Sequence, residues 1–249
     1  MMTWIALALL VFFLGPAVVF FTGGTRLRGD WSVASHEPTG QAPDPAEVRE
    51  AVVQAYAARA FAWRGAFGVH TWIAVKPANA DEYTRYEAIG WRLYRGLPLV
   101  SIASERAPDA QWFGAHPTLL RELRGAAAEA VMAALPMAVA SYPYPDEYRP
   151  WPGPNSNTFT AHVARQIPGL RLVLPANAIG KDYLGKGEFF ARSPSGTGLQ
   201  LSWSGWVGVL VGWKEGIEIQ ILALTIGIDP LGLAISLPGI GRLGRAIVP

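Results

Sequence analysis

The chain has 249 residues, of which 51% are hydrophobic and 16% charged, with a formal net charge of +2. This composition excludes an intrinsically disordered chain, which needs few apolar and many charged residues. The near-neutral charge also excludes a dedicated nucleic-acid binder, because neutralising phosphates requires a dense basic surface. There is no cysteine, which excludes disulfides, thiolate nucleophiles and cysteine-ligated metals.

The amino-terminal segment from Trp4 to Thr22 carries no charge. A helix of about 17–25 apolar residues is long enough to cross the hydrocarbon layer of a membrane. No basic residue precedes the segment and no small-residue cleavage pattern follows it, so we expect a retained anchor rather than a signal peptide. The predicted organisation is a transmembrane anchor over residues 1–25, a linker over 26–45 and one domain over 46–249.

The first half of this domain is predicted to contain one helix and three strands. Residues 47–64 form an alanine-rich stretch with a helical apolar stripe. Residues 69–76 alternate as a strand does and end at Pro77. Residues 83–93 and 99–103 are the second and third predicted strands, and the first two pair as an antiparallel hairpin.

The second half is predicted to begin with a helix from Thr118 to Pro136 and a loop rich in proline and aromatic residues. A second helix is expected over 157–166. From residue 199 onward, short apolar strands separated by glycines indicate a β-meander. The predicted fold class is therefore α+β.

His70 and Glu87 are the first two candidate catalytic residues. With the hairpin turn near Asn79, Glu87 pairs near Trp72 and lies one cross-strand diagonal from His70. A carboxylate there would accept from one imidazole nitrogen and increase the basicity of the other. The alternatives are a half-buried histidine bonded to a backbone carbonyl, and a solvated glutamate paired with a neighbouring Arg85, Arg92 or Lys76.

Ser156 is the third candidate, because it lies just before the predicted helix 157–166. A hydroxyl at a helix start is commonly an N-cap. Asn155 or Asn157 would cap the helix equally well, which would leave Ser156 free to act as a nucleophile near the positive end of the helix dipole. We expect Asn155, Asn157, Trp72 and Tyr148 to line the binding site.

The remaining histidines and tryptophans add no further candidate site. The remaining histidines, His36, His116 and His162, lack the spacing of a metal site, so we expect neither a metal nor a cofactor. Trp203, Trp206 and Trp213 fit either the sheet core or a membrane-interface belt.

Long segments resemble the bacterial family called domain of unknown function 3750. The resemblance is carried by AVVQAYAARAFAWRGAFGVHTWIAVKP, YEAIGWR, SYPYPDEYRPWPGPNSNTFTAHVAR, LPANAIGKDY and GIDPLGLAISLPGIGRLG. A weaker resemblance is to circularly permuted NlpC-type papain-like hydrolases and lecithin:retinol acyltransferase-like proteins. Asn155-Ser156-Asn157-Thr158-Phe159 has the shape of their nucleophile motif, with serine in place of cysteine.

The second resemblance implies a papain-like layout with His70, Glu87 and Ser156 as base, orienting group and nucleophile. It implies acyl transfer or hydrolysis of an envelope amide or ester, with the domain facing the periplasm. Together with the predicted anchor, this gives a single-pass protein of the bacterial inner membrane. The competing hypothesis is a non-catalytic envelope module, in which Ser156 caps a helix or the site binds without cutting. The sequence names no protein partner.

Overall fold

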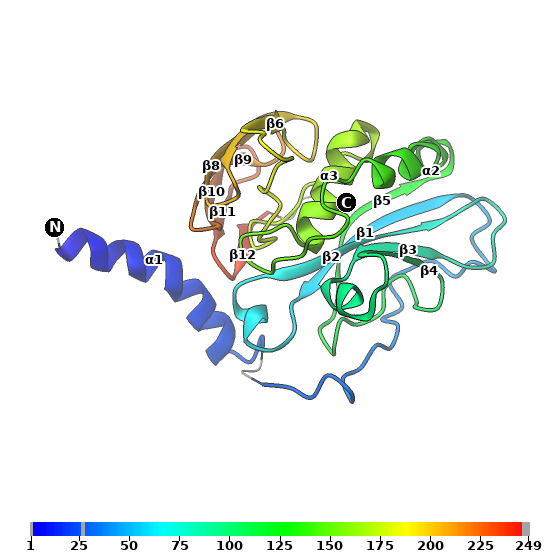
Figure 1. Ribbon diagram of the computed structural model, residues 1–249, viewed down its shortest axis with the longest axis horizontal. Coiled ribbons are helices and arrows are strands. Elements are labelled where there is room, and N and C mark those ends of the chain that lie inside the picture. The colour runs from blue at the N-terminus through cyan, green and yellow to red at the C-terminus, as the bar shows by residue number, and fades with distance from the viewer. Residues whose placement is uncertain (1, 26–27, 246–249) are drawn as a thin grey trace.

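The computed structural model describes residues 2–25 and 28–245 and has two antiparallel sheets (Figure 1). The first has the order β4-β3-β2-β1-β5, and the second runs in sequence order from β6 to β12. The mixed α+β class is confirmed.

The first sheet consists of β1 (Val52–Arg59), β2 (Val69–Lys76), β3 (Thr84–Ala88), β4 (Val100–Ala103) and β5 (Thr118–Arg124). Two helices, α2 (Gly125–Ala140) and α3 (Ser156–Gln166), cover one face of it, and the largest hydrophobic core lies between them and the sheet. Short 3-10 helices lie at Ala62–Ala66 (η1), Gly90–Arg95 (η2) and Pro168–Leu170 (η3).

The predicted helix over 47–64 is wrong, because β1 occupies its middle part, from Val52 to Arg59. This strand lies between β2 and β5 and is buried on both faces, so its side chains show no alternation of apolar and polar residues. Val52, Val53 and Tyr56 are residue types that strands favour, but the alanines around them obscured that signal.

The predicted helix from Thr118 is wrong in its first part. Residues 118–124 form β5, which pairs with β1, and α2 starts only at Gly125. The helix also continues past Pro136 to Ala140, because Leu135 and Ala138 on either side of the proline are buried in the core. The second predicted strand is shorter than expected and gives way to η2 after Ala88.

The second sheet confirms the predicted meander and extends it. It consists of β6 (Phe190–Arg192), β7 (Gly198–Trp203), β8 (Val207–Gly212), β9 (Gly216–Ile221), β10 (Leu224–Asp229), β11 (Ala234–Leu237) and β12 (Gly241–Gly244). Every neighbouring pair is antiparallel, as expected for strands joined by short turns.

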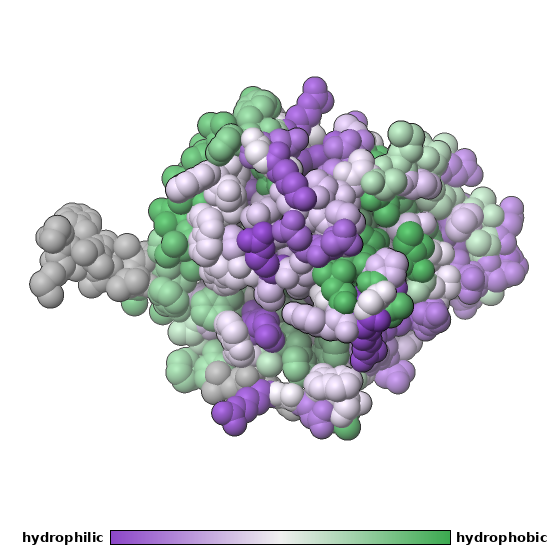
Figure 2. Space-filling view, viewed as in Figure 1, coloured by the Kyte–Doolittle hydropathy of each residue, from purple (hydrophilic) through white to green (hydrophobic). Residues whose placement is uncertain are grey.

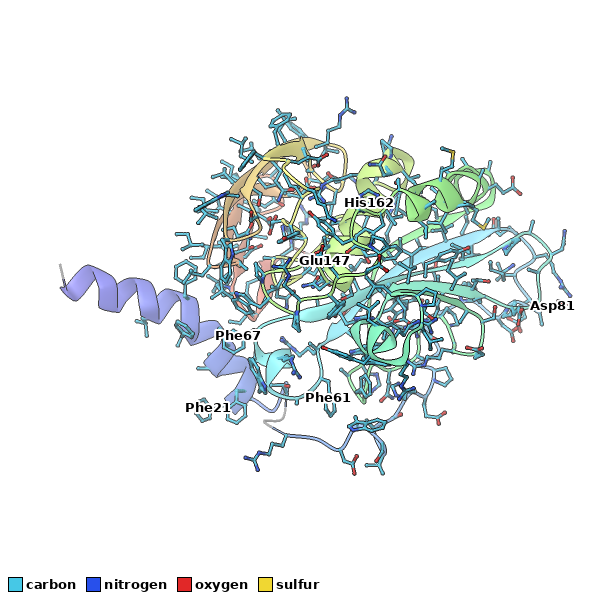
Figure 3. The ribbon with its side chains drawn as sticks, in the orientation of Figure 1. Phe21, Phe61, Phe67, Asp81, Glu147 and His162 are labelled. Carbon is cyan, nitrogen blue, oxygen red and sulfur yellow. The ribbon has the colours of Figure 1, made fainter. Side chains whose placement is uncertain are left out.

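The amino-terminal helix α1 (Met2–Phe21) leaves the body on the side that carries the second sheet (Figure 1). Phe67, labelled in Figure 3, lies beside this helix and packs edge-on against Phe13, with 6.3 Å between ring centroids. Over the residues described with their side chains, no helix is both long and apolar enough to cross a membrane. The transmembrane span expected at residues 4–22 is therefore not supported by the structure.

Candidate functional site

His70 and Glu87 lie on the neighbouring strands β2 and β3. Ile73 is opposite Tyr86 and Ala74 is opposite Arg85, which is the predicted register and places Glu87 diagonally across from His70. The His70 Nε2 atom lies 2.9 Å from the Glu87 Oε2 atom. Both side chains are buried, so Glu87 is not the solvated strand residue considered above.

Arg85 is a third member of this group. Its Nη2 atom donates to the same Glu87 Oε2 atom at 3.0 Å, and its guanidinium carbon lies 4.5 Å from the centre of the Trp72 ring. Burial opposes the ionisation of Glu87, but the Arg85 charge and the His70 hydrogen bond outweigh it and lower the pKa of Glu87 to about 2. Glu87 is therefore a carboxylate at neutral pH.

The charge on Glu87 fixes the protonation of His70. A carboxylate can only accept hydrogen bonds, so the His70 Nε2 atom must carry a proton. Burial lowers the pKa of His70, and the hydrogen bond that it donates to Glu87 only partly offsets this effect. At neutral pH His70 is thus a neutral imidazole with its unprotonated nitrogen at Nδ1, which has no hydrogen-bond partner among the described residues.

Aromatic rings cover His70. The Trp112 ring stacks on the imidazole with 3.6 Å between centroids and 7° between planes, and Trp91 stacks on Trp112 in turn. Trp112 comes from the loop between β4 and β5, and Trp91 from η2. Sequence reasoning missed both residues, since neither has a recognisable spacing relative to His70.

Trp72 and Tyr148, two of the expected binding residues, have different surroundings. Trp72 is fully buried, stacks on Tyr56, and donates from its indole Nε1 atom to the Pro108 carbonyl at 2.7 Å. These contacts make Trp72 part of the packing beneath the site. Tyr148 packs on Gly90, where a Cβ atom would lie only 2.4 Å from the phenol ring, so only glycine admits the ring at that position.

The helix α3 starts beside His70 because β2 has a free edge there. Pairing between β2 and β3 begins only at Ile73. At this edge, which pairs with no strand in the described part of the chain, the Val69 carbonyl accepts from Asn157 Nδ2 at 2.9 Å, and the Val69 N–H donates to the Asn177 carbonyl. Thr71 donates to Asn157 Oδ1 at 3.0 Å. The first turn of α3 therefore takes the place of a neighbouring strand.

Asn155 is the N-cap of α3. Its Oδ1 atom accepts from the backbone N–H groups of Asn157 and Thr158, and its Nδ2 atom donates to the carbonyls of Pro150 and Ile179. The amide groups of Asn155 and Asn157 are occupied by protein partners. We therefore assign both residues to the positioning of α3 rather than to ligand binding.

Ser156 is the first residue of α3 and is not its cap, so its hydroxyl is free of the role that the simpler hypothesis gave it. The Ser156 carbonyl lies 3.5 Å from the Thr71 hydroxyl, one residue along the strand from His70. No hydrogen bond among the described residues joins the Ser156 hydroxyl to His70. Burial raises the pKa of Tyr148, and hydrogen bonding to the side chain and backbone of Ser156 opposes that rise.

The site also contains two arginines that each have an N–H group without a hydrogen-bond partner among the described residues. Within the described residues, Arg85 Nε and Arg106 Nη1 are shielded from solvent and make no hydrogen bond. The charges of Arg85 and Arg106 both act on His70 and Glu87. Buried donors of this kind are costly unless they are paired, so an acceptor oxygen would be stabilised here. The described residues include no group of three His, Asp or Glu that could hold a metal ion.

Comparison with known proteins adds a family and no activity. The model of a family described as protein of unknown function (DUF3750) matches residues 50–183. The matched segment contains His70, Glu87 and Ser156 and ends before the second sheet. No curated protein and no solved structure matches the chain significantly.

Proposed function

We propose, for a chain that belongs to the DUF3750 family, an acyl hydrolase or acyltransferase function towards an amide or ester. In this proposal Ser156 is the nucleophile, His70 the general base and Glu87 the group that orients His70. The observation that carries the proposal is the hydrogen bond between His70 Nε2 and Glu87 Oε2. This bond leaves the basic Nδ1 atom of His70 without a proton. His70 lies on β2, and α3, which starts with Ser156, begins beside the free edge of that strand.

The proposed reaction has two halves. The His70 Nδ1 atom takes the Ser156 proton as the Ser156 oxygen attacks the carbonyl carbon, and the tetrahedral intermediate expels an amine or alcohol that receives that proton. A water or acceptor alcohol then attacks the acyl-serine in the same way and releases Ser156. The positive end of the α3 dipole stabilises the oxyanion.

Two requirements follow from the proposal. The Ser156 hydroxyl must turn towards Nδ1 when substrate binds, which is a common tightening of catalytic hydrogen bonds. The Trp112 loop must move aside to admit the substrate, because its indole covers His70. The unpartnered N–H groups of Arg85 and Arg106 favour a substrate that carries an acceptor oxygen, such as a carboxylate, beside the scissile bond.

A fluorophosphonate probe tests the nucleophile. We expect the full-length protein to be labelled at Ser156, as located by peptide mass spectrometry. In Ser156→Ala the labelling rate should fall on the order of 1,000-fold or more, as for other nucleophile deletions. The matched control is Ser141→Ala, which removes a hydroxyl at the end of α2. A wild-type protein that stays unlabelled, or a Ser156→Ala variant labelled as fast as wild type, would contradict the proposal.

The burial of the site favours a second candidate, a non-catalytic binding module of the bacterial envelope. Ser156 is 3% exposed and His70 is 5% exposed, which restricts access to both. On this hypothesis the wild-type protein is folded but never labelled by the probe, and Ser156→Ala affects stability at most. A site that binds substrate without cutting it would give the same lack of labelling.

The cellular setting is part of the proposal. We propose that the domain lies in the periplasm at the bacterial inner membrane, on the basis of the resemblance to envelope hydrolases.

A further inference from the structure

The second sheet has an apolar outer side, here called the apolar face. It comprises the solvent-exposed side chains of β7 to β12. One row across six strands consists of Leu199, Val211, Ile217, Ile228, Ile235 and Leu243, paired in register. The next row contains Leu201, Val209 and Ile219. Figure 2 shows hydrophobic residues gathered along this flank of the body.

The inner side of the same sheet is polar. Gln200, Glu218, Gln220 and Thr225 point inward and are buried. Glu218 pairs with Lys181, and Gln200 accepts from Arg165 of α3 at 2.7 Å. An antiparallel sheet in water normally directs its apolar side to the core and its polar side to solvent. Here the two sides are exchanged, so burial inside this chain does not explain the aliphatic rows.

The two ends of the apolar face differ. At one end, Trp213 is exposed in the β8–β9 turn next to Lys214. Burial lowers the pKa of Lys214, and the positive charges of Arg121 and Arg171 lower it further. Glu215 lies in the same turn but is buried.

At the other end the apolar face continues into α1. Phe12 of α1 packs against the buried cluster of Ile179, Ala223 and Leu224. Ala223 lies at the β9–β10 turn and donates its N–H to the carbonyl of Trp206, which is exposed, as is Trp203. Further along, α1 exposes Leu10, Phe13, Leu14, Val18 and Phe21. One apolar surface thus extends from Trp213 and Lys214 across the sheet and onto α1.

We propose that the apolar face docks on the surface of a lipid bilayer containing anionic phospholipid. The outward positions of β7 to β10 carry no charge, and the Trp203 indole is their only hydrogen-bonding side chain. A protein partner would instead require about one hydrogen bond per 100–200 Å² of interface. Indoles with adjacent cations are the residues that anchor proteins at the headgroup level.

A single fluorescent label tests the docking directly. The chain has no cysteine, so Ile219→Cys can be labelled uniquely with an environment-sensitive nitrobenzoxadiazole dye. Ile219 lies in the middle of the apolar face and is 51% exposed. The matched control is Met137→Cys, where an apolar side chain is exposed on α2, a helix that packs on the first sheet. Both full-length proteins are mixed with vesicles of phosphatidylglycerol and phosphatidylethanolamine.

We expect the dye at position 219 to shift to the blue with these vesicles and to be quenched by doxyl-labelled lipid, while the dye at position 137 keeps its emission in water. Binding driven by α1 alone would leave position 219 in water and would overturn the proposal. A blue shift at position 219 without vesicles, together with a dimeric mass by light scattering, would also overturn it, because a second copy would then cover the face. If the labelled full-length protein does not bind the vesicles at all, the proposal is likewise overturned.

Discussion

Glu87→Ala is expected to destabilise the protein by about 3–5 kcal/mol, as does breaking other buried ion pairs by removal of one partner. The substitution leaves the buried guanidinium of Arg85 without its carboxylate and the Nε2–H of His70 without its acceptor. The free energy of unfolding in urea, measured at neutral pH, checks this value.

The effect of Glu87 should depend on pH with a definite sign. Its pKa in the folded protein is lowered to about 2, below the ordinary value of 4.5, so its contribution to stability is present above that ordinary value. The contribution is lost as the pH falls through 4.5 towards 2, and the stability difference between wild type and Glu87→Ala narrows over that range.

The matched control is Glu147→Ala, because Glu147 pairs with Arg149 at a comparable 2.9 Å but is much more exposed. Its removal should cost less than about 1 kcal/mol. Equal losses for the two variants would contradict a buried ion pair at Glu87.

Lys181→Met is the other substitution with a large expected effect. Lys181 is 1% exposed, pairs with Glu218 and lies 3.8 Å from Asp182. Burial opposes its charge, but the two carboxylates outweigh burial and raise the pKa of Lys181. The variant leaves two buried carboxyl groups without their shared cation, so a loss of about 3–5 kcal/mol is expected in urea unfolding.

A double-mutant cycle separates the ion pair from packing. The double variant Lys181→Met/Glu218→Gln also removes the carboxylate of Glu218, which Lys181→Met alone leaves without its cation. The double variant should therefore be more stable than the sum of the two single losses predicts. Strict additivity would show that Lys181 and Glu218 do not interact in the folded protein.

The sequence predicted elements best where turn residues, prolines or a helix cap delimit them. The strand expected at residues 69–76 has those bounds in β2, and the helix expected at 157–166 starts one residue earlier in α3. The sequence-based prediction failed at β1 and β5, because these two strands pair with each other although they lie more than 50 residues apart in the chain. Local propensity contains no information about such pairing.

Part of the candidate site could also be predicted. The hairpin turn fixes the register that brings Glu87 to His70, and the Asn-Ser-Asn sequence indicated that an asparagine could cap α3 in place of Ser156. Trp112 could not be predicted, because a long loop brings it over His70. In the second sheet, alternation predicts two unlike faces, but only the tertiary structure decides which one faces inward.

The protonation of the His70 ring tests the central claim most directly. In ¹⁵N-labelled protein the ring nitrogens can be observed by NMR, and with only four histidines in the chain the loss of one set of signals in His70→Gln assigns them. We expect a neutral ring at neutral pH, protonated at Nε2 and unprotonated at Nδ1, with a pKa below the ordinary value. A proton on Nδ1, or a doubly protonated ring at neutral pH, would contradict the account, because His70 could not then accept the Ser156 proton.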